Sequence, residues 1–340
     1  MDGQGVFVHN GGFTYSFGVG SAKGVVQNFG LGATYISQAN FNGFLGMNWV
    51  TVLDMQVISA GPDIQMLTAT GRFVTFTWNG SGWDPPTGFE AAVLSDPNPG
   101  EYLLTYSTGG SVLFVGGRVD TVTDRNGNAT TLTWSGGKAT KFTDSRGLDH
   151  TLSYYSTNRL KELAMDDGRV WTFDYNAADQ LTRVHGPTTA SFTSGITWEF
   201  RYTNGSTDPE LNHNMVAAID GKGQPWLKMT YDQYDRVVTQ QIGPGTYAFD
   251  YSNIGSQETT VTDPSGAQRV WGWDAGKLTR SSLEQLSNLN VRGTDPTSWD
   301  TAWTRRWCVN RSAKRPSPRT LRQPTPESPQ TPATRSPACG

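Results

Sequence analysis

The stretch Asp124-Arg125-Asn126-Gly127-Asn128-Ala129-Thr130-Thr131-Leu132-Thr133-Trp134 decides the fold of this 340-residue chain. It joins a turn ending in glycine to an apolar, a polar and an aromatic residue, and the phrase recurs six more times. The later copies are Gly147…Leu152-Ser153-Tyr154, Gly168…Phe173-Asp174-Tyr175, Gly195…Phe200-Arg201-Tyr202, Gly223…Met229-Thr230-Tyr231, Gly245…Phe249-Asp250-Tyr251 and Gly266…Trp271-Gly272-Trp273. Successive glycines lie 20, 21, 27, 28, 22 and 21 residues apart, which predicts a tandem-repeat protein.

Each copy alternates in polarity, as a strand does when one of its faces is buried. A turn rich in Gly, Asn or Asp follows the aromatic residue, and a second apolar stretch then returns. One repeat is therefore predicted to be a β-hairpin of about 20 residues, and hairpins must pair edge to edge for stability. The predicted structural repeat positions, whose aromatic rings pack on one face between strands, are Gly127, Trp134, Gly147, Tyr154, Gly168, Tyr175, Tyr202, Tyr231, Tyr251 and Trp273.

The chain divides by pattern into three predicted parts. Residues 1–118 hold strand-like runs separated by Gly-rich turns and are predicted to be a diverged start of the same sheet, because Gly71…Phe76-Thr77-Trp78 echoes the repeat. Residues 119–282 carry the repeats, and residues 283–340 are irregular. The fold class is thus all-β: tandem hairpins form a long, curved or spiralling sheet that ends in a disordered tail. An unpaired sheet edge is expected near Trp271–Trp273.

The tail has a different composition from the rest of the chain. Residues 305–340 hold eight Lys and Arg, one acid (Glu327), seven prolines and both cysteines, for a charge of +7. The remaining residues hold 19 Lys and Arg against 29 Asp and Glu, for a charge of −10. Three interpretations stay open: an out-of-frame read of the gene, a disordered segment, or a basic arm for anionic surfaces.

The sequence contains few candidates for chemistry. The histidines His9, His150, His185 and His213 are dispersed, with no partner at metal-ligand spacing. Aspartates recur at turns, where they bond backbone N–H groups: Asp124, Asp144, Asp166, Asp167, Asp220 and Asp263. No catalytic residue, metal site or cofactor is therefore predicted, and the chain is expected not to be an enzyme, although a glycosidase or protease is retained as a third interpretation.

The repeat resembles the YD repeat of the RHS family, the bacterial relatives of teneurin cores. The best copies are Asp124-Arg125-Asn126-Gly127-Asn128, Asp144-Ser145-Arg146-Gly147 and Phe173-Asp174-Tyr175-Asn176. Upstream, Gly5-Val6-Phe7-Val8-His9-Asn10-Gly11-Gly12-Phe13 and Gly43-Phe44-Leu45-Gly46-Met47-Asn48-Trp49 resemble the family's N-terminal shell segment. The resemblance covers about residues 5–280. It implies a hollow β-shell that encloses a C-terminal passenger, often a toxin, or presents an adhesion module.

Two departures refine this expectation. The chain has too few repeats for a whole shell, and it lacks the family's C-terminal boundary motif with its self-cleaving aspartates. The prediction is therefore a non-catalytic N-terminal shell fragment of a polymorphic toxin. Its partners would be the remainder of the shell and the toxin or effector passenger. The alternative is a cell-surface module for carbohydrate binding, with glycan or cell-wall polymer as the partner.

The expected location follows from the same features. No stretch of about 18 apolar residues occurs, so no membrane span is expected. The first residues, Met1-Asp2-Gly3-Gln4, lack the basic and apolar regions of a signal peptide. The full-length parent is expected to be secreted or at the cell surface, and no nucleic-acid partner is predicted.

Overall fold

A computed structural model describes residues 5–21, 30–190, 192–274, 277–284 and 293–295. All of them belong to the first of two compact units in the chain, Met1–Thr301. In this described part the regular structure is β-strand, apart from three short 3₁₀ turns, which confirms the all-β prediction. The turns are η1 (Val52–Asp54), η2 (Pro209–His213) and η3 (Ile254–Ser256). The predicted tail, residues 283–340, lies almost entirely outside the described residues, and the predicted division at residue 118 stays a prediction.

The first strands form small sheets of their own. A three-stranded antiparallel sheet has the order β1 (Thr14–Ser21), β2 (Gly30–Ile36), β5 (Trp49–Thr51), and a short hairpin joins β3 (Asn42–Gly43) to β4 (Gly46–Met47). The expectation that residues 1–118 begin the long sheet is therefore wrong for these five strands. These strands carry no copy of the repeat, and they pair with one another instead of with the long sheet.

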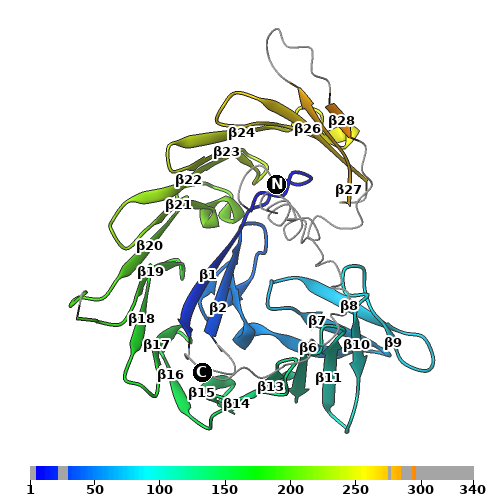
Figure 1. Cartoon of the computed structure of the whole chain (residues 1–340), viewed down its shortest axis with the longest axis vertical. Helices are drawn as coiled ribbons and strands as arrows, with labels where there is room; N and C mark the ends of the chain where they lie inside the picture. The colour runs from blue at the N-terminus through cyan, green and yellow to red at the C-terminus, as the bar shows by residue number, and fades with distance from the viewer. Residues whose placement is uncertain (1–4, 22–29, 191, 275–276, 285–292, 296–340) are drawn as a thin grey trace, which may run out of the picture. The chain divides into compact units, whose positions relative to one another are not determined.

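One long antiparallel sheet holds all the strands from β6 to β28, and successive strands pair except β9 with β10 (Figure 1). The first group is β6 (Gln56–Ala60), β7 (Asp63–Leu67), β8 (Phe73–Trp78) and β9 (Trp83–Asp84), with β6 also bridged to β13. The next strands are β10 (Ala92–Ser95), β11 (Glu101–Tyr106), β12 (Ser111–Val115), β13 (Arg118–Thr123), β14 (Ala129–Ser135), β15 (Lys138–Thr143), β16 (Asp149–Tyr154), β17 (Leu160–Ala164), β18 (Val170–Tyr175) and β19 (Leu181–His185). The last are β20 (Thr197–Tyr202), β21 (Met215–Ile219), β22 (Pro225–Tyr231), β23 (Val237–Ile242), β24 (Gly245–Asp250), β25 (Glu258–Thr262), β26 (Gln268–Asp274), β27 (Lys277–Glu284) and β28 (Gly293–Asp295).

The edge expected near Trp271–Trp273 is not free. Strand β26 pairs with β27 along its whole length, from Gln268 opposite Glu284 to Asp274 opposite Lys277. The repeat phrase stops at Trp273, but the strand pairing continues beyond it, so the end of the phrase did not mark the end of the sheet.

The turn at Asp124 shows why the repeat folds into hairpins. The Asp124 side chain accepts hydrogen bonds from the backbone N–H groups of Asn126 and Asn128, at 2.8 and 2.9 Å. The Gly127 N–H donates to the Asp124 carbonyl, and Gly127 adopts φ +84°, a conformation that glycine reaches without steric cost. The carboxyls of Asp144, Asp220 and Asp263 bond backbone N–H groups in the same way, as the sequence predicts.

The apolar residues of the repeat point into one continuous core. Leu132, Phe173 and Phe200 are at most 3 % exposed, as are Phe13, Tyr35 and Trp49 of the first strands. In the first six copies the residue between the apolar and aromatic positions is exposed or half-buried, as the alternation requires, whereas Gly272 of the seventh copy is buried. The described residues include no helix that is both long and apolar enough to cross a membrane.

Candidate functional site: the docking line of the N-terminal segment

A β-bulge precedes the aromatic residue in most copies of the repeat. Thr133 pairs with Lys141 but Trp134 pairs with Ala139, so one residue of the returning strand, Thr140, has no partner in the pairing. The same shift occurs before Tyr154, Tyr175, Tyr202, Tyr231 and Trp273. A bulge removes one residue from the strand ladder and bends the strand. The repeat therefore places a bend and an unpaired backbone group at the same end of each hairpin.

The aromatic residue of the repeat bonds to the preceding hairpin, with or without a bulge before it. Its hydroxyl or indole N–H donates to a backbone carbonyl 14 to 21 residues earlier in the chain. The pairs are Trp134 to Val119 (2.7 Å), Tyr154 to Ala139 (2.8 Å), Tyr175 to Leu160 (2.8 Å), Tyr202 to Leu181 (2.7 Å), Tyr231 to Met215 (3.0 Å) and Tyr251 to Val237 (2.8 Å). At Trp273 the backbone N–H donates to the Gln257 carbonyl. Burial raises the pKa of the Tyr154 and Tyr202 hydroxyls, so they remain donors.

The Tyr154 hydroxyl provides a simple test of these bonds. Tyr154→Phe is expected to cost about 1 kcal/mol of unfolding free energy, since it removes one hydrogen bond and keeps the ring. Urea unfolding of the two proteins measures this difference. Tyr234→Phe is a suitable control, because the Tyr234 side chain is 66 % exposed. Equal stability of the Tyr154→Phe protein and the wild type would contradict the assigned role.

The N-terminal segment, described over residues 5–21 and 30–55, docks on the ends of several hairpins, most of which carry a bulge. We call this row of hairpin ends, from residue 158 to residue 259, the docking line. Five sites on it bond to the segment: Leu160 N–H to Phe44 O, Met47 N–H to Asp179 O, Tyr35 to His213 O and Met215 N–H, Val237 N–H to Gly11 O, and Thr259 Oγ1 to Val8 O. One segment therefore ties together hairpins that are far apart in the sequence.

In three turns of the docking line the residue in the left-handed conformation is not glycine. Asn158, Asp179 and Asp235 have φ values of 67°, 59° and 61°, whereas turns such as those at Gly127 and Gly136 use glycine. A side chain in this conformation costs free energy, although Asn and Asp tolerate it best. Two of these residues also bond to the N-terminal segment through their backbone carbonyls, at Asp179 and Asp235. The strain is therefore found where the two parts meet.

Arg159 is the main ionic contact of the docking line. Its guanidinium donates from Nη1 to Gly43 O at 2.8 Å, and from Nη2 to Asn42 Oδ1 at 2.5 Å and Asp179 Oδ2 at 2.9 Å. The Arg159 side chain is 8 % exposed, whereas that of Asp179 is 43 % exposed. The close approach is also visible at Gly46, where a Cβ atom would lie 2.2 Å from Asp179 O.

An aromatic cluster fills the space next to Arg159 along the line. Trp49 donates from its indole to the Tyr202 hydroxyl at 2.8 Å and contacts the Phe200 ring, with centroids 5.0 Å apart. The Tyr35 ring packs on Trp49 with centroids 5.6 Å apart. Its hydroxyl donates to His213 O and accepts a hydrogen bond from the Met215 N–H. Trp49 and Tyr35 are both fully buried.

The Asp54 side chain makes hydrogen bonds within the N-terminal segment. Its carboxylate accepts hydrogen bonds from the N–H groups of Phe44 and Thr51, and from the Thr51 hydroxyl. Burial raises the pKa of this carboxyl to about 6, although these hydrogen bonds oppose the shift. Because the folded pKa lies above the unfolded value, the folded state binds a proton more tightly than the unfolded chain does. The associated stabilisation is present in acid and is lost as the pH rises through about 6.

Protonation of the Asp54 carboxyl should be visible in the pH dependence of the unfolding free energy. The unfolding free energy of the wild type, minus that of Asp54→Asn, is expected to rise by about 1 kcal/mol when the pH falls from about 7.5 to about 5. The difference is the quantity to measure, because burial lowers the pKa of His9 and His213 and these groups oppose the trend in both proteins. A difference that stays flat over this range would contradict the assignment.

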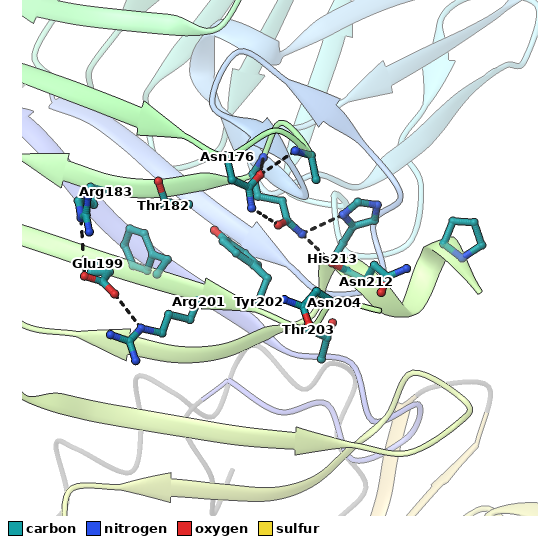
Figure 2. A pocket seen from close by; sticks show the side chains of 14 residues that line it. Asn176, Thr182, Arg183, Glu199, Arg201, Tyr202, Thr203, Asn204, Asn212 and His213 are labelled. Atoms are coloured by element: carbon teal, nitrogen blue, oxygen red, sulfur yellow. Dashed lines mark hydrogen bonds and ion pairs between the residues drawn. The ribbon is translucent and has the colours of Figure 1, made fainter. Parts of the chain in front are cut away.

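An open cavity lies beside the docking line (Figure 2). It has a volume of about 800 Å³, and the side chains of Phe200 and Tyr202 form the aromatic part of its wall. Its polar groups are bonded largely to one another: Gln180 donates to Asn212 O and His213, and Glu199 pairs with Arg201 at 2.7 Å. The cavity therefore offers few free donors or acceptors to a ligand.

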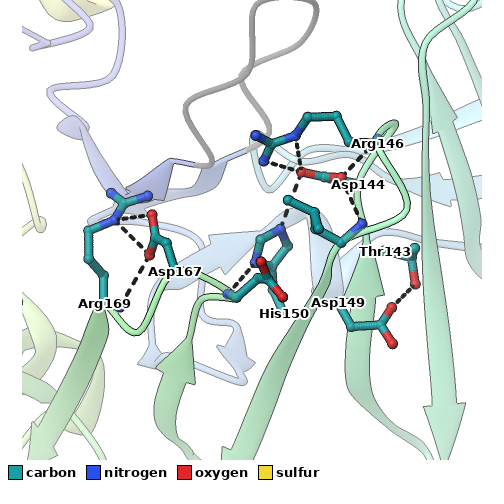
Figure 3. A network of polar contacts seen from close by, with 9 residues as sticks. Thr143, Asp144, Arg146, Asp149, His150, Asp167 and Arg169 are labelled. Carbon is teal, nitrogen blue, oxygen red and sulfur yellow. Dashed lines mark hydrogen bonds and ion pairs between the residues drawn. The ribbon is translucent and has the colours of Figure 1, made fainter.

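A buried histidine lies at the opposite ends of the hairpins (Figure 3). His150 is 2 % exposed and accepts the Asp166 N–H at Nδ1, which places its proton on Nε2, 3.5 Å from Asp144 Oδ2. The pKa of Asp144 is lowered to about 2, because its bonds to Arg146 and to backbone N–H groups outweigh the opposing effect of burial. Nδ1 is bonded to the backbone and the ring packs tilted against Phe142, with centroids 4.6 Å apart, which favours a structural role for His150.

The other predicted candidates for chemistry lie apart. His185 bonds to Asp174 and Thr197, His213 bonds to Gln180, and His9 contacts Phe7. The described residues contain no group of three His, Cys, Asp or Glu side chains that could hold a metal ion. Sequence reasoning missed Arg159 and Asp235, whose only signal was an Asn or Asp in place of glycine at a turn position. Trp49 was noted only as part of the stretch Gly43–Trp49, without its contacts.

Comparisons with known proteins leave the family open. No family model matches the sequence, and no curated protein matches it. Among solved structures, TcdB2-TccC3 without its hypervariable C-terminal region is 14 % identical over 75 % of this chain and 15 % of that chain, with a TM-score of 0.37. A Photorhabdus luminescens Tc holotoxin pore is 13 % identical over 81 % and 14 % of the two chains (TM-score 0.28), and a porin-like protein from Bacteroides uniformis is 15 % identical over 58 % and 89 % (TM-score 0.26). Likenesses at this level do not establish a relationship, and the chain spans about 15 % of the length of TcdB2-TccC3.

Proposed function

We propose that this chain is a non-catalytic structural wall, part of the shell of an RHS/YD-repeat protein. The observation that carries the proposal is the docking line. A single N-terminal segment bonds to five hairpin ends, and the repeat aromatics bond hairpins to the ones before them. These bonds stabilise a continuous surface of strands and leave few polar groups available for chemistry.

The repeat aromatics support this role over carbohydrate binding. A ring that stacks on a sugar must be exposed, whereas the rings of Tyr154, Tyr175 and Tyr202 pack against the core and their hydroxyls are bonded to backbone carbonyls. The same side chains cannot serve both purposes. The glycan-binding alternative would therefore need other residues.

The wall would enclose a passenger. On this proposal the partners are the rest of the shell and a C-terminal toxin or effector, and the full-length protein acts outside the cell or at its surface. No cofactor is required, because enclosure depends on backbone pairing and packing alone.

Protease protection of the polypeptide made from the complete reading frame tests enclosure. In the native protein, the part that follows the repeats should survive proteinase K and should become digestible once denaturant opens the sheet. The Trp49→Ala variant should expose it at a lower denaturant concentration, while Trp78→Ala should behave as the native protein does. Rapid digestion of that part in the native protein would rule out enclosure.

A further inference from the structure

Asparagine followed by glycine occurs five times in the chain: Asn10-Gly11, Asn42-Gly43, Asn79-Gly80, Asn126-Gly127 and Asn204-Gly205. In this dipeptide the glycine nitrogen can attack the carbonyl carbon of the asparagine side chain, because glycine has no Cβ atom to hinder the approach. The reaction needs a side chain that is free to rotate and a glycine N–H that is free to lose its proton. The fold therefore decides which of the five pairs can react.

Two of the pairs have a glycine nitrogen that is already bonded. The Gly11 N–H donates to Phe7 O at 2.7 Å, and the Gly127 N–H donates to Asp124 O at 3.0 Å. Gly11 is also buried. A nitrogen that holds its proton in such a bond, within a turn of fixed geometry, is a poor nucleophile. These two pairs are therefore protected.

Two other pairs have an asparagine side chain that is held in place. Asn42 Oδ1 accepts a hydrogen bond from Arg159 Nη2 at 2.5 Å. Asn79 Oδ1 accepts from the N–H groups of Ser81 and Gly82, at 3.0 and 3.1 Å. These bonds must break before either side chain can turn toward its own backbone, so these pairs are protected although Asn42 and Asn79 are both exposed.

The pair Asn204-Gly205 lacks both kinds of protection. Both residues are exposed, and within the described part of the chain neither the Asn204 side chain nor the Gly205 N–H makes a hydrogen bond. The pair lies between β20 and η2, outside any strand. Asn204 also lines the open cavity beside the docking line (Figure 2).

We propose that Asn204 is the deamidation site of this protein. The Gly205 nitrogen bonds to Asn204 Cγ, and its proton leaves with the side-chain amide group as ammonia, which yields a cyclic imide. Water then adds to one of the two imide carbonyl groups and opens the ring, to aspartate or to isoaspartate. Water is the only co-reactant, and no group is oxidised or reduced.

The reaction changes the cavity wall. The lining residues include two arginines, Arg183 and Arg201, and a single acid, Glu199, so a carboxylate at position 204 adds a second acid. Isoaspartate in addition routes the main chain through the former side chain, which lengthens the connection to η2. The modified protein therefore presents a cavity of different charge and shape.

Peptide mapping of the full chain by mass spectrometry tests this assignment. The native protein is incubated at mildly alkaline pH, and the exchange of the amide for a carboxyl group is followed at all five pairs. A second sample is incubated in guanidinium chloride, where no pair is protected. We expect Asn204 to convert at a similar rate in both samples, and the other four pairs to convert at least about tenfold more slowly in the native protein, because each must first open locally.

Two variants provide matched controls. Asn204→Gln should remove the acidic species that isoelectric focusing detects in the incubated native protein, because the longer side chain closes a ring far more slowly. Asn126→Gln, at another exposed turn, should leave that species unchanged. Conversion of any other pair as fast as that of Asn204 in the native protein would overturn the proposal. So would slow conversion of Asn204 in the native protein, to the extent seen for the other four.

Discussion

Replacing Arg159 with methionine is expected to lower the unfolding free energy by about 3 kcal/mol, within the range for breaking a buried ion pair. The guanidinium is buried and holds Gly43 and Asn42 of the N-terminal segment against Asp179 of the sheet. Methionine fills much of the same space but leaves the Gly43 carbonyl buried without its donor. The loss should stay near the lower limit because the Asp179 side chain is 43 % exposed and can be hydrated again.

Urea unfolding followed by tryptophan fluorescence measures this effect. Arg201→Met is the matched control, because Arg201 also pairs with a single carboxylate, that of Glu199, but is 63 % exposed. Exposed ion pairs contribute about 0–1 kcal/mol, so this variant should unfold close to the wild type. If Arg159→Met were as stable as Arg201→Met, the N-terminal segment would be held by packing alone and Arg159 would have no special role.

The hairpin repeat was readable from sequence because its signals are local. The Asp124 turn, the glycine that follows it and the alternation up to Trp134 all act within a dozen residues. Strand pairing between successive hairpins then follows from the need to cover each edge. The same reasoning failed for the first strands and at Trp271–Trp273, because there the pairing is decided by residues that carry no copy of the phrase.

The docking line could not be predicted for a physical reason. Its contacts join residues such as Val8 and Thr259, which are 251 positions apart, and no local periodicity records such a pairing. Arg159 follows a turn asparagine and looks in sequence like a solvated charge. Asp235 looks like an ordinary turn residue, although its backbone carbonyl accepts a bond from Gln38 of the N-terminal segment. Chemistry of this kind appears only when distant segments are placed together.

Trp49→Ala is expected to have the largest effect of any single substitution, about 3–5 kcal/mol, as for other fully buried tryptophans. The ring packs against Tyr15, Tyr35 and Phe200, and its N–H donates to the Tyr202 hydroxyl. Its removal would leave a cavity at the centre of the docking line. The segment and the sheet would then lose their largest shared contact.

Two further variants separate packing from hydrogen bonding at this position. Trp49→Phe should recover much of the loss, because it restores most of the ring volume, and the Tyr202 hydroxyl keeps its bond to Leu181 O. Trp78→Ala, at a site that is 40 % exposed, should cost no more than about 1 kcal/mol. If Trp49→Ala unfolded in two steps, with the N-terminal segment released first, the segment would be a separate unit. A single transition at lower urea would show that the docking line makes the segment and the hairpins one cooperative structure.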